Sequence, residues 1–447
     1  MSFGAVYPWG YWPLLAASAL IGAGSFLLAR GDAADLGKVA AVLAIVAVVI
    51  AAQLIPVPAA AILALNPARD AFLKRYDVLY ALMPTAHALS ISPETTRIAL
   101  ACFAAFSVSL LGTARMTSRP GAPRFLVAGI TGFGTLLALS ALVQNLALTN
   151  QTGEGHTILI YGFWPDPYAN KPFGPYINKN NYAGWMLMAF PLAFGLFAAS
   201  LDRLWRSVGP DRTARFLALS SKDGARALLA GLASLVMAVS IVVSMSRSAM
   251  IALALTILGV AWFAPVDKPK RGVRLAIAAV VMVIVAAWAG AETIRSRFED
   301  RSDASMRGRL IAWRNAAHVV ANYPVMGTGF NTFRTAMLVY QEGDPDNLWE
   351  EAHNDYLQIA AEGGLVGASA ALLAVVVIAI EIRGRFRDGS PSRSSLWIRA
   401  GAVAGICAIA IQELVEFSLQ IPGNAALFAV LVGIALHRAP RPALSRA

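Results

Sequence analysis

Apolar stretches long enough to cross a bilayer recur along the whole chain. A transmembrane helix needs about 20 predominantly apolar residues, and this pattern predicts eleven of them. They lie at 12–29, 38–57, 95–113, 124–146, 182–200, 227–244, 248–264, 274–290, 358–381, 398–414 and 423–437. The segment 58–90 is apolar only in patches and is broken by prolines, so a re-entrant or twelfth span there remains an alternative. The pattern therefore predicts an all-α, polytopic integral membrane protein with eleven or twelve transmembrane helices.

One long polar insert, residues 291–357, interrupts this series. It divides the chain into three parts. Residues 1–124 hold the first helices, residues 125–382 form a membrane core that includes the insert, and residues 383–447 hold the last helices and a short tail. No internal repeat of solenoid length is visible. The insert is therefore the only segment in which we expect a sizeable structure outside the membrane.

The distribution of basic residues predicts the orientation in the membrane. One alternating set of short segments carries 23 Lys and Arg residues, and seven of the remaining basic residues lie in the long insert. Short cytoplasmic loops are rich in Lys and Arg, whereas long translocated loops escape this rule. We therefore expect a cytoplasmic C-terminus and an insert on the outer side. Eleven spans would put the N-terminus outside. A secretory signal peptide begins with a positively charged region, but the first basic residue of this chain is Arg30, so we expect no signal peptide.

Composition narrows the classes of function. The chain is 57% hydrophobic and 14% charged, with a net charge of +11. Its basic residues are scattered over short loops, so we expect membrane lipids around it and no nucleic-acid partner. Cys102 and Cys407 both fall inside apolar stretches, which gives no disulfide framework and no metal site.

Polar side chains gather in three clusters on the predicted outer side. The first, Asn178 to Asn181, enters the span at 182–200. It has two interpretations. Asn is a good helix N-cap, with Lys179 anchoring at the membrane surface. Alternatively, Asn178, Lys179 and Asn181 bind an anionic or sugar group at the helix N-terminus.

The second cluster is Ser246-Arg247-Ser248, between two apolar stretches with almost no loop. Arg247 therefore lies at a tight hairpin on the outer face. One interpretation is that the Arg247 side chain snorkels to the membrane–water interface and has no further role. Because this side disfavours basic residues in short loops, we favour phosphate binding by its guanidinium.

The third cluster is the insert. A helix is predicted from about residue 305 to Asn322, before Pro324. Arg309 and Trp313 are four residues apart, so they share a helix face and can stack. The sequence Gly327-Thr328-Gly329-Phe330 then turns the chain but lacks the spacing of a phosphate loop.

The insert ends in His353-Asn354-Asp355, next to the apolar span at 358–381. Ionisable residues at such a border are costly, which points to a function. If residues 353–362 are helical, Asp355 lies about 200° from His353 and is poorly placed to orient it. Asp355 then acts as a local cap or neighbour. No second His or Cys lies at ligand spacing, so no metal is expected.

Taken together these residues resemble the O-antigen ligase and polymerase superfamily of bacterial membrane proteins. The resemblance covers roughly residues 125–382, most firmly 174–367. It rests on five segments: Asn178-Lys179-Asn180-Asn181-Tyr182-Ala183-Gly184, Ser246-Arg247-Ser248-Ala249, Arg309 followed by Trp313, Pro324-Val325-Met326-Gly327-Thr328-Gly329-Phe330-Asn331, and Ala352-His353-Asn354-Asp355-Tyr356-Leu357-Gln358.

The resemblance implies a glycosyltransferase of the all-helical membrane type, similar to the GT-C class, in the bacterial inner membrane. Its donor would be undecaprenyl pyrophosphate carrying a saccharide. The acceptor at the periplasmic face would be a lipid A–core sugar in a ligase, or another glycan in a polymerase. Transfer would be inverting and independent of metals and cofactors. Arg247 and Arg309 would bind the pyrophosphate, and His353 would act near the acceptor hydroxyl.

Residues around these three complete the predicted site, with Lys179, Asn178, Asn181, Asn354 and Asp355 in contact with substrate. Protein O-oligosaccharyltransferases are a third variant, although this chain lacks the large C-terminal soluble domain that many of them carry. A transporter of an anion or a lipid-linked sugar is the main alternative, and an assembly partner in envelope biogenesis is another. Transporter sites tend to lie at the middle of the bilayer between repeated halves. The crowding of polar residues on one face favours the enzyme.

Overall fold

The structure is a computed structural model of the 447-residue chain. It describes residues 2–28, 35–149, 159–160, 164–165, 173–263, 301–342, 348–387 and 392–438. The predicted span at 274–290 and the end of the C-terminal tail lie outside these residues. So does the part of the insert between 291 and 300.

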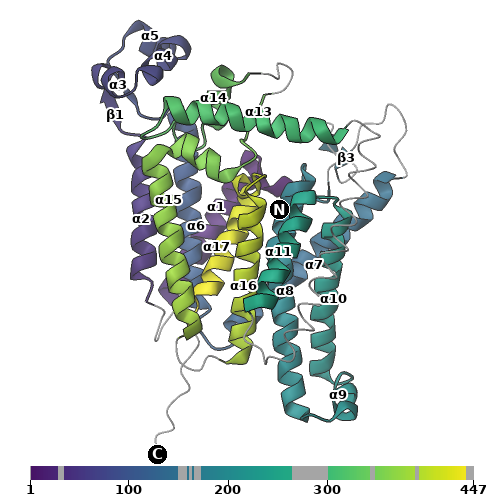
Figure 1. Cartoon of the computed structure of the whole chain (residues 1–447). Helices are drawn as coiled ribbons and strands as arrows, with labels where there is room; N and C mark the ends of the chain where they lie inside the picture. Colours follow the sequence, from purple (N-terminus) through teal and green to yellow (C-terminus); the bar gives the residue numbers. More distant parts are fainter. Residues whose placement is uncertain are drawn as a thin grey trace, which may run out of the picture.

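Long apolar helices form the body of the molecule (Figure 1). Ten predicted spans correspond to α1 (Pro8–Leu28), α2 (Gly37–Ala52), α6 (Pro93–Met116), α7 (Ala122–Thr149), α8 (Lys179–Val208), α10 (Lys222–Val243), α11 (Arg247–Phe263), α15 (Asp355–Arg387), α16 (Arg393–Gln412) and α17 (Pro422–Leu436). Among the described residues, seven helices are long and apolar enough to cross a membrane, and α2, α17 and the described part of α11 are shorter apolar helices. The chain is thus an all-α, multi-pass membrane protein, as predicted.

Helix α8 forms the centre of the bundle. It packs against α7, α10 and α16, and its residues 185–189 are almost completely buried. Small residues let the helices approach closely. A Cβ atom added at Gly401 of α16 would lie 2.5 Å from the Pro191 carbonyl oxygen of α8. In contrast, α15 exposes Leu372, Val375 and Ile380, which suits a helix facing lipid.

The segment 58–90 folds into a small lobe rather than a further span. It contains α3 (Ala59–Leu65), α4 (Pro67–Tyr76) and α5 (Val78–Leu82). Strand β1 (Pro56–Pro58) pairs antiparallel with β2 (Ala86–Ala88) at its base. The longest of these helices has 10 residues, about half of what a bilayer requires. The alternative of a twelfth span in this segment is therefore wrong.

The insert covers one end of the bundle, which we call the insert face. Helix α13 (Arg301–Asn322) lies across this end, and α14 (Phe333–Tyr340) lies beside it (Figure 1). As predicted, α13 ends at Asn322. Two short strands, β3 (Leu159–Ile160) and β4 (Trp164–Pro165), precede α8, whereas the short helix α9 (Arg212–Ala218) lies at the opposite end.

The two ends of the described chain lie at opposite faces. The 3-10 helix η1 (Ser2–Ala5) places Gly4 against Ile421, at the start of α17 on the insert face. After α17 has crossed the bundle, the Arg438 amide donates to Ser118 Oγ, just beyond the end of α6. An odd number of crossings produces this arrangement.

A break in α15 attaches the insert to the bundle. Gly364 has φ 59°, so two carbonyl groups before it and two amides after it lose their helical partners. The chain at 324–329 replaces them: the Thr328 and Gly329 amides donate to the carbonyls of residues 361 and 362, at 3.0 and 2.9 Å. The amides of Leu365 and Val366 donate to those of residues 324 and 325. The glycine-containing turn is therefore a backbone joint.

Glu362 completes this joint. Its carboxylate accepts backbone N–H groups from Asn331, Thr332 and Phe333 at 2.9–3.0 Å. These amides include the first turn of α14, where a carboxylate is stabilised by unsatisfied N–H groups and the helix dipole. The buried side chain of Glu362 in α15 thus orients α14 and fixes the insert in place.

Candidate functional site

The start of α8 and the α10–α11 hairpin meet at the insert face. The Asn178 side chain accepts the Asn180 amide at 2.8 Å and caps α8, which supports the capping interpretation of this residue. Lys179 Nζ donates to the Met245 carbonyl in the hairpin at 3.3 Å. Met245 has φ 56°, a left-handed conformation that makes this turn tight.

The hairpin presents Arg247 as the first residue of α11. Ser246 is buried, and its Oγ lies 3.3 Å from Ser248 Oγ. Arg247 itself is exposed, and within the described residues its guanidinium has no hydrogen bond or ion pair. The side chain is thus free to bind a group that comes from outside the described part of the chain.

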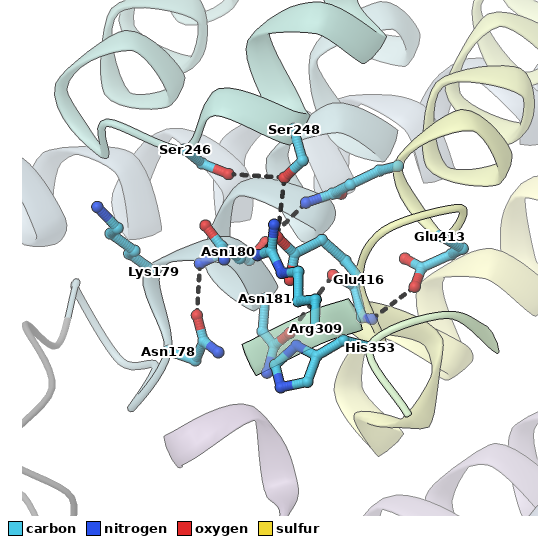
Figure 2. A network of polar contacts seen from close by, with 12 residues as sticks. Asn178, Lys179, Asn180, Asn181, Ser246, Ser248, Arg309, His353, Glu413 and Glu416 are labelled. Atoms are coloured by element: carbon cyan, nitrogen blue, oxygen red, sulfur yellow. Dashed lines mark hydrogen bonds and ion pairs between the residues drawn. The ribbon is translucent and has the colours of Figure 1, made fainter. Parts of the chain in front are cut away.

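Arg309 reaches this hairpin from α13 and is held by a carboxylate from a third region. Its Nη2 lies 2.6 Å from Glu416 Oε1, and Ser248 Oγ donates to the same oxygen at 3.1 Å (Figure 2). The Arg309 side chain is 15% exposed and that of Glu416 is 1% exposed. One buried carboxylate therefore joins the insert to the hairpin.

The predicted stacking of Arg309 on Trp313 is not among the contacts of the described residues. The two side chains instead have separate partners. The Trp313 indole donates to the His353 carbonyl at 3.2 Å, while Arg309 turns to Glu416. Both contacts run from the same helix face, so α13 holds the backbone of His353 and the guanidinium of Arg309 together.

His353 lies just before α15 rather than inside a helix. It has φ 51°, and α15 begins at Asp355, so the assumption that residues 353–362 are helical is wrong at its first two residues. The Asn354 side chain accepts the Leu357 amide at 3.0 Å and caps the helix. The position of Asp355 relative to His353 follows from this turn and not from helical periodicity.

The His353 imidazole lies between two aromatic rings. Trp349 and Phe417 approach it edge-on at centroid distances of 5.6 and 4.7 Å. Its Nδ1 is buried and has no hydrogen-bond partner in the described structure. Burial, and then the positive charge of Arg309, lower the pKa of His353 to about 4. The ring is therefore neutral at pH 7 and can accept a proton.

Asp355 and Glu413 form a pair of carboxyl groups next to the site. Gln420 Nε2 donates to Asp355 Oδ1 at 3.0 Å, and Asp355 also hydrogen-bonds to Glu413. Glu413 accepts the Ser418 amide at 2.7 Å. Burial, followed by the charge of Asp355, raises the pKa of Glu413 well above its ordinary value. A proton held on Glu413 allows these two carboxyl groups to lie together.

The structure brings some predicted site residues together and separates others. Lys179 contacts the hairpin at Met245, Arg309 is joined to it through Glu416, and His353 lies on the other side of Arg309 (Figure 2). Asn181 is 4% exposed and is held by Ser418 and Asn424, so it supports the site from within. Asn178 and Asn354 are helix caps, which accounts for their side chains without a substrate.

Sequence reasoning missed the connection between α16 and α17, residues 413–421, which we call the α16–α17 loop. It supplies Glu413, Glu416 and Phe417, each of which contacts a predicted site residue or its neighbour. A signal was present in the sequence. Glu413 lies at the end of the predicted span 398–414, and Glu416 lies between it and the next span, on the side expected to be outer. Ionisable groups near a bilayer are costly, so these two carboxylates pointed to a function as His353 did.

Among the residues that the structure describes, no group of three or more His, Cys, Asp or Glu side chains is arranged to hold a metal ion. The site there consists of guanidinium, ammonium, imidazole and carboxylate groups. Such a set can bind a phosphate-containing group through its cations and accept a proton at the imidazole.

Part of the chain matches a known protein family. Residues 232–372 match the family model described as O-Antigen ligase. The match spans the hairpin, the insert and the beginning of α15. It confirms the resemblance for four of the five segments, whereas the first, Asn178 to Gly184, lies outside the matched residues. No match was found among curated proteins.

Proposed function

We infer that residues 232–372 form a domain of the O-antigen ligase and polymerase superfamily. From this premise, we propose that the membrane protein transfers a glycan from undecaprenyl pyrophosphate to an acceptor hydroxyl. Glycan transfer is the general activity that the family implies. The observation that supports this site for it is that the consecutive residues Glu416 and Phe417 hold Arg309 and His353, from the two ends of the insert, near each other, while Glu416 also binds Ser248 of the α10–α11 hairpin. We place the insert face on the periplasmic side of the inner membrane, as the distribution of basic residues suggests.

The cations at the insert face suit a pyrophosphate leaving group. Departure of a lipid pyrophosphate builds negative charge on oxygen, and fixed donors in a partly desolvated site stabilise such charge strongly. Arg309 uses Nη2 for Glu416, and a guanidinium has further N–H groups for phosphate oxygens. Arg247 and Lys179 lie at the hairpin on the same face. We assign Arg247 and Arg309 to the donor.

His353 suits the acceptor. In the proposed step, the acceptor oxygen forms a bond to the anomeric carbon while the bond from that carbon to the pyrophosphate oxygen breaks. The acceptor proton passes to the His353 imidazole, which is neutral near pH 7. Attack opposite to the leaving group inverts the anomeric centre. Undecaprenyl pyrophosphate leaves with the electron pair, so the step needs neither a metal nor a redox partner.

Two acceptors fit this proposal. A lipid A–core sugar would make the protein a ligase, and another lipid-linked glycan would make it a polymerase of O-antigen or exopolysaccharide. We favour the ligase. A transporter of an anion or lipid-linked sugar would use the same cations, but the groups of this site come from the insert, the start of α8, the α10–α11 hairpin and the α16–α17 loop, at one end of the bundle rather than at its middle.

A transfer assay with purified components tests the function. The protein would be incubated in detergent with undecaprenyl-pyrophosphate-linked glycan and with lipid A–core or lipid-linked glycan as alternative acceptors, with product identified by mass spectrometry. We expect a new glycosidic bond to one acceptor and release of undecaprenyl pyrophosphate. We expect the His353→Ala variant to insert and fold but to transfer at least about 100-fold more slowly. Normal transfer by that variant would remove His353 from the chemistry.

A further inference from the structure

The α16–α17 loop contacts residues from all three outer clusters, although it lies outside residues 232–372 and outside every motif of the resemblance. Glu416 binds Arg309 of the insert and Ser248 of the hairpin. Phe417 packs against the His353 ring. Ser418 Oγ lies 3.4 Å from Asn181 Oδ1 in α8. One short loop thus joins segments that are far apart in the sequence.

We propose that Glu416 is a positioning residue for glycan transfer, which directs the Arg309 guanidinium toward the pyrophosphate of the donor. This inference rests on the proposed function. Glu416 acts through Arg309 and does not touch the substrate. It would therefore affect the use of the donor more than the use of the acceptor.

The shared oxygen of Glu416 is the first argument. Oε1 accepts Arg309 Nη2 at 2.6 Å and Ser248 Oγ at 3.1 Å, so the carboxylate is fixed from both sides. An arginine side chain has several rotatable bonds, and ordering it costs conformational entropy. Because Glu416 orders the Arg309 side chain before substrate arrives, that cost is absent from donor binding.

Burial is the second argument. The Glu416 side chain is 1% exposed and that of Arg309 is 15% exposed. Exposed ion pairs fix geometry poorly, whereas a carboxylate held inside the protein keeps its direction. The small exposed part of Arg309 leaves an approach for an anion. The pair is therefore anchored on its Glu416 side and open on the other.

Chain connectivity is the third argument. Glu416 and Phe417 are consecutive, and they contact the proposed donor-binding Arg309 and the proposed proton acceptor His353. The backbone between them fixes the spacing of these two groups. Correct spacing of reacting groups contributes strongly to catalysis, and small displacements lower the rate.

Steady-state transfer kinetics test this role with Glu416→Gln, Arg309→Ala and the double variant. We expect Glu416→Gln to lower kcat/KM for the lipid-linked donor about tenfold, with the acceptor KM changed less than about twofold. In the Arg309→Ala background the same substitution should have less than about a twofold effect, because its target is gone. A Glu416→Gln variant with wild-type donor kinetics, or effects of the two substitutions that multiply, would overturn the proposal.

Two further variants keep the test decisive. Glu416→Asp retains the charge but shortens the side chain, so we expect a donor KM between those of wild type and Glu416→Gln. If Glu416→Gln does not fold, Glu416→Asp still tests the proposal. An unchanged donor KM in Glu416→Asp would count against it. Glu350→Gln is the matched control. It removes an exposed ion pair with Arg334, at 2.9 Å, on the same insert, and should transfer at the wild-type rate.

A binding measurement separates this inference from the proposed function. Undecaprenyl pyrophosphate without a sugar would be titrated into each variant, with tryptophan fluorescence as the signal. We expect weaker binding by Glu416→Gln and by Arg309→Ala, and equal affinity for the double variant and Arg309→Ala. Equal affinity of Glu416→Gln and wild type would overturn the role of Glu416. Wild-type binding without any glycan transfer would instead contradict the proposed function.

Discussion

At the residue scale, the same side chain has different chemistry in different surroundings. Arg247 and Arg309 are both arginines of the site, yet Arg247 is exposed whereas Arg309 pairs with a buried carboxylate. His353 is neutral because its ring is buried and Arg309 is near. Residue identity therefore suggests what these groups can do, and their partners decide which state each adopts.

Replacing Arg247 with Lys should reveal whether its fork of N–H groups binds phosphate. Lysine keeps the positive charge but loses the bidentate geometry. We expect transfer to fall at least about tenfold, while the amount of folded protein stays unchanged because Arg247 is exposed. Donor KM and kcat are the measurements. A lysine variant with wild-type kinetics would return Arg247 to the role of a surface anchor.

The pH dependence of transfer should follow the lowered pKa of His353. An ordinary histidine loses its charge near pH 6.5, whereas His353 does so at about 4. Since the proposed mechanism needs the neutral ring, kcat should stay nearly constant between about pH 8 and pH 5 and fall only nearer pH 4. A kcat profile that falls to half near pH 6.5 would disagree with this environment of His353.

The same shift has a consequence for stability. Because the folded-state pKa of His353 lies below the unfolded value, protonation favours the unfolded chain. The contribution of neutral His353 to stability is present above about pH 6.5 and is lost as pH falls from there toward 4. His353→Ala should therefore lower the pH dependence of the unfolding temperature in this range.

At the element scale, the glycine turn of the insert and the break in α15 form one joint. The motif 324–331 is one of the five segments of the family resemblance, and its backbone pairs with α15 on both sides of Gly364. The sequence predicted the turn and the end of α13. It could not predict the joint, because the two halves are complementary only after α15 breaks.

Replacing Gly364 with Ala should disrupt this joint. Gly364 has φ 59°, and an added Cβ would lie 2.5 Å from the Gly327 nitrogen and the Val325 carbonyl oxygen. The left-handed conformation alone costs about 1–2 kcal/mol for a residue with a side chain. We expect a lower unfolding temperature in detergent and loss of transfer. Gly384→Ala in the same helix, where no atom lies within 4 Å of the added Cβ, is the control and should be neutral or stabilising.

At the scale of the whole molecule, the bundle carries its proposed chemistry on one face. The insert, the hairpin and the α16–α17 loop converge there, whereas α17 ends at the opposite face beside the end of α6. Two lipid-anchored substrates in the same membrane could meet at such a surface without leaving the bilayer. The position of the insert face is thus central to the proposed function.

Cysteine labelling tests this orientation. In a background without Cys102 and Cys407, a membrane-impermeant maleimide should label Glu350→Cys from the periplasmic side. It should label Arg212→Cys, in the short helix α9, only after the inner membrane is opened. Arg212 is exposed, and the Glu350 side chain is 40% exposed, so a maleimide can reach both. The reverse pattern would place the insert face in the cytoplasm and remove access to periplasmic acceptors.

The sequence by itself determined the class of the protein, ten of the described helices and the residue types of the site. These follow from local hydrophobicity and from motifs, each of which is contained in a short stretch of chain. Tertiary structure decided which side chains meet. Arg309 and Glu416 are 107 positions apart, so no local pattern could pair them. It also placed His353 in a left-handed turn and gave the glycine motif a structural role, because both depend on the long-range fit of the insert against α15.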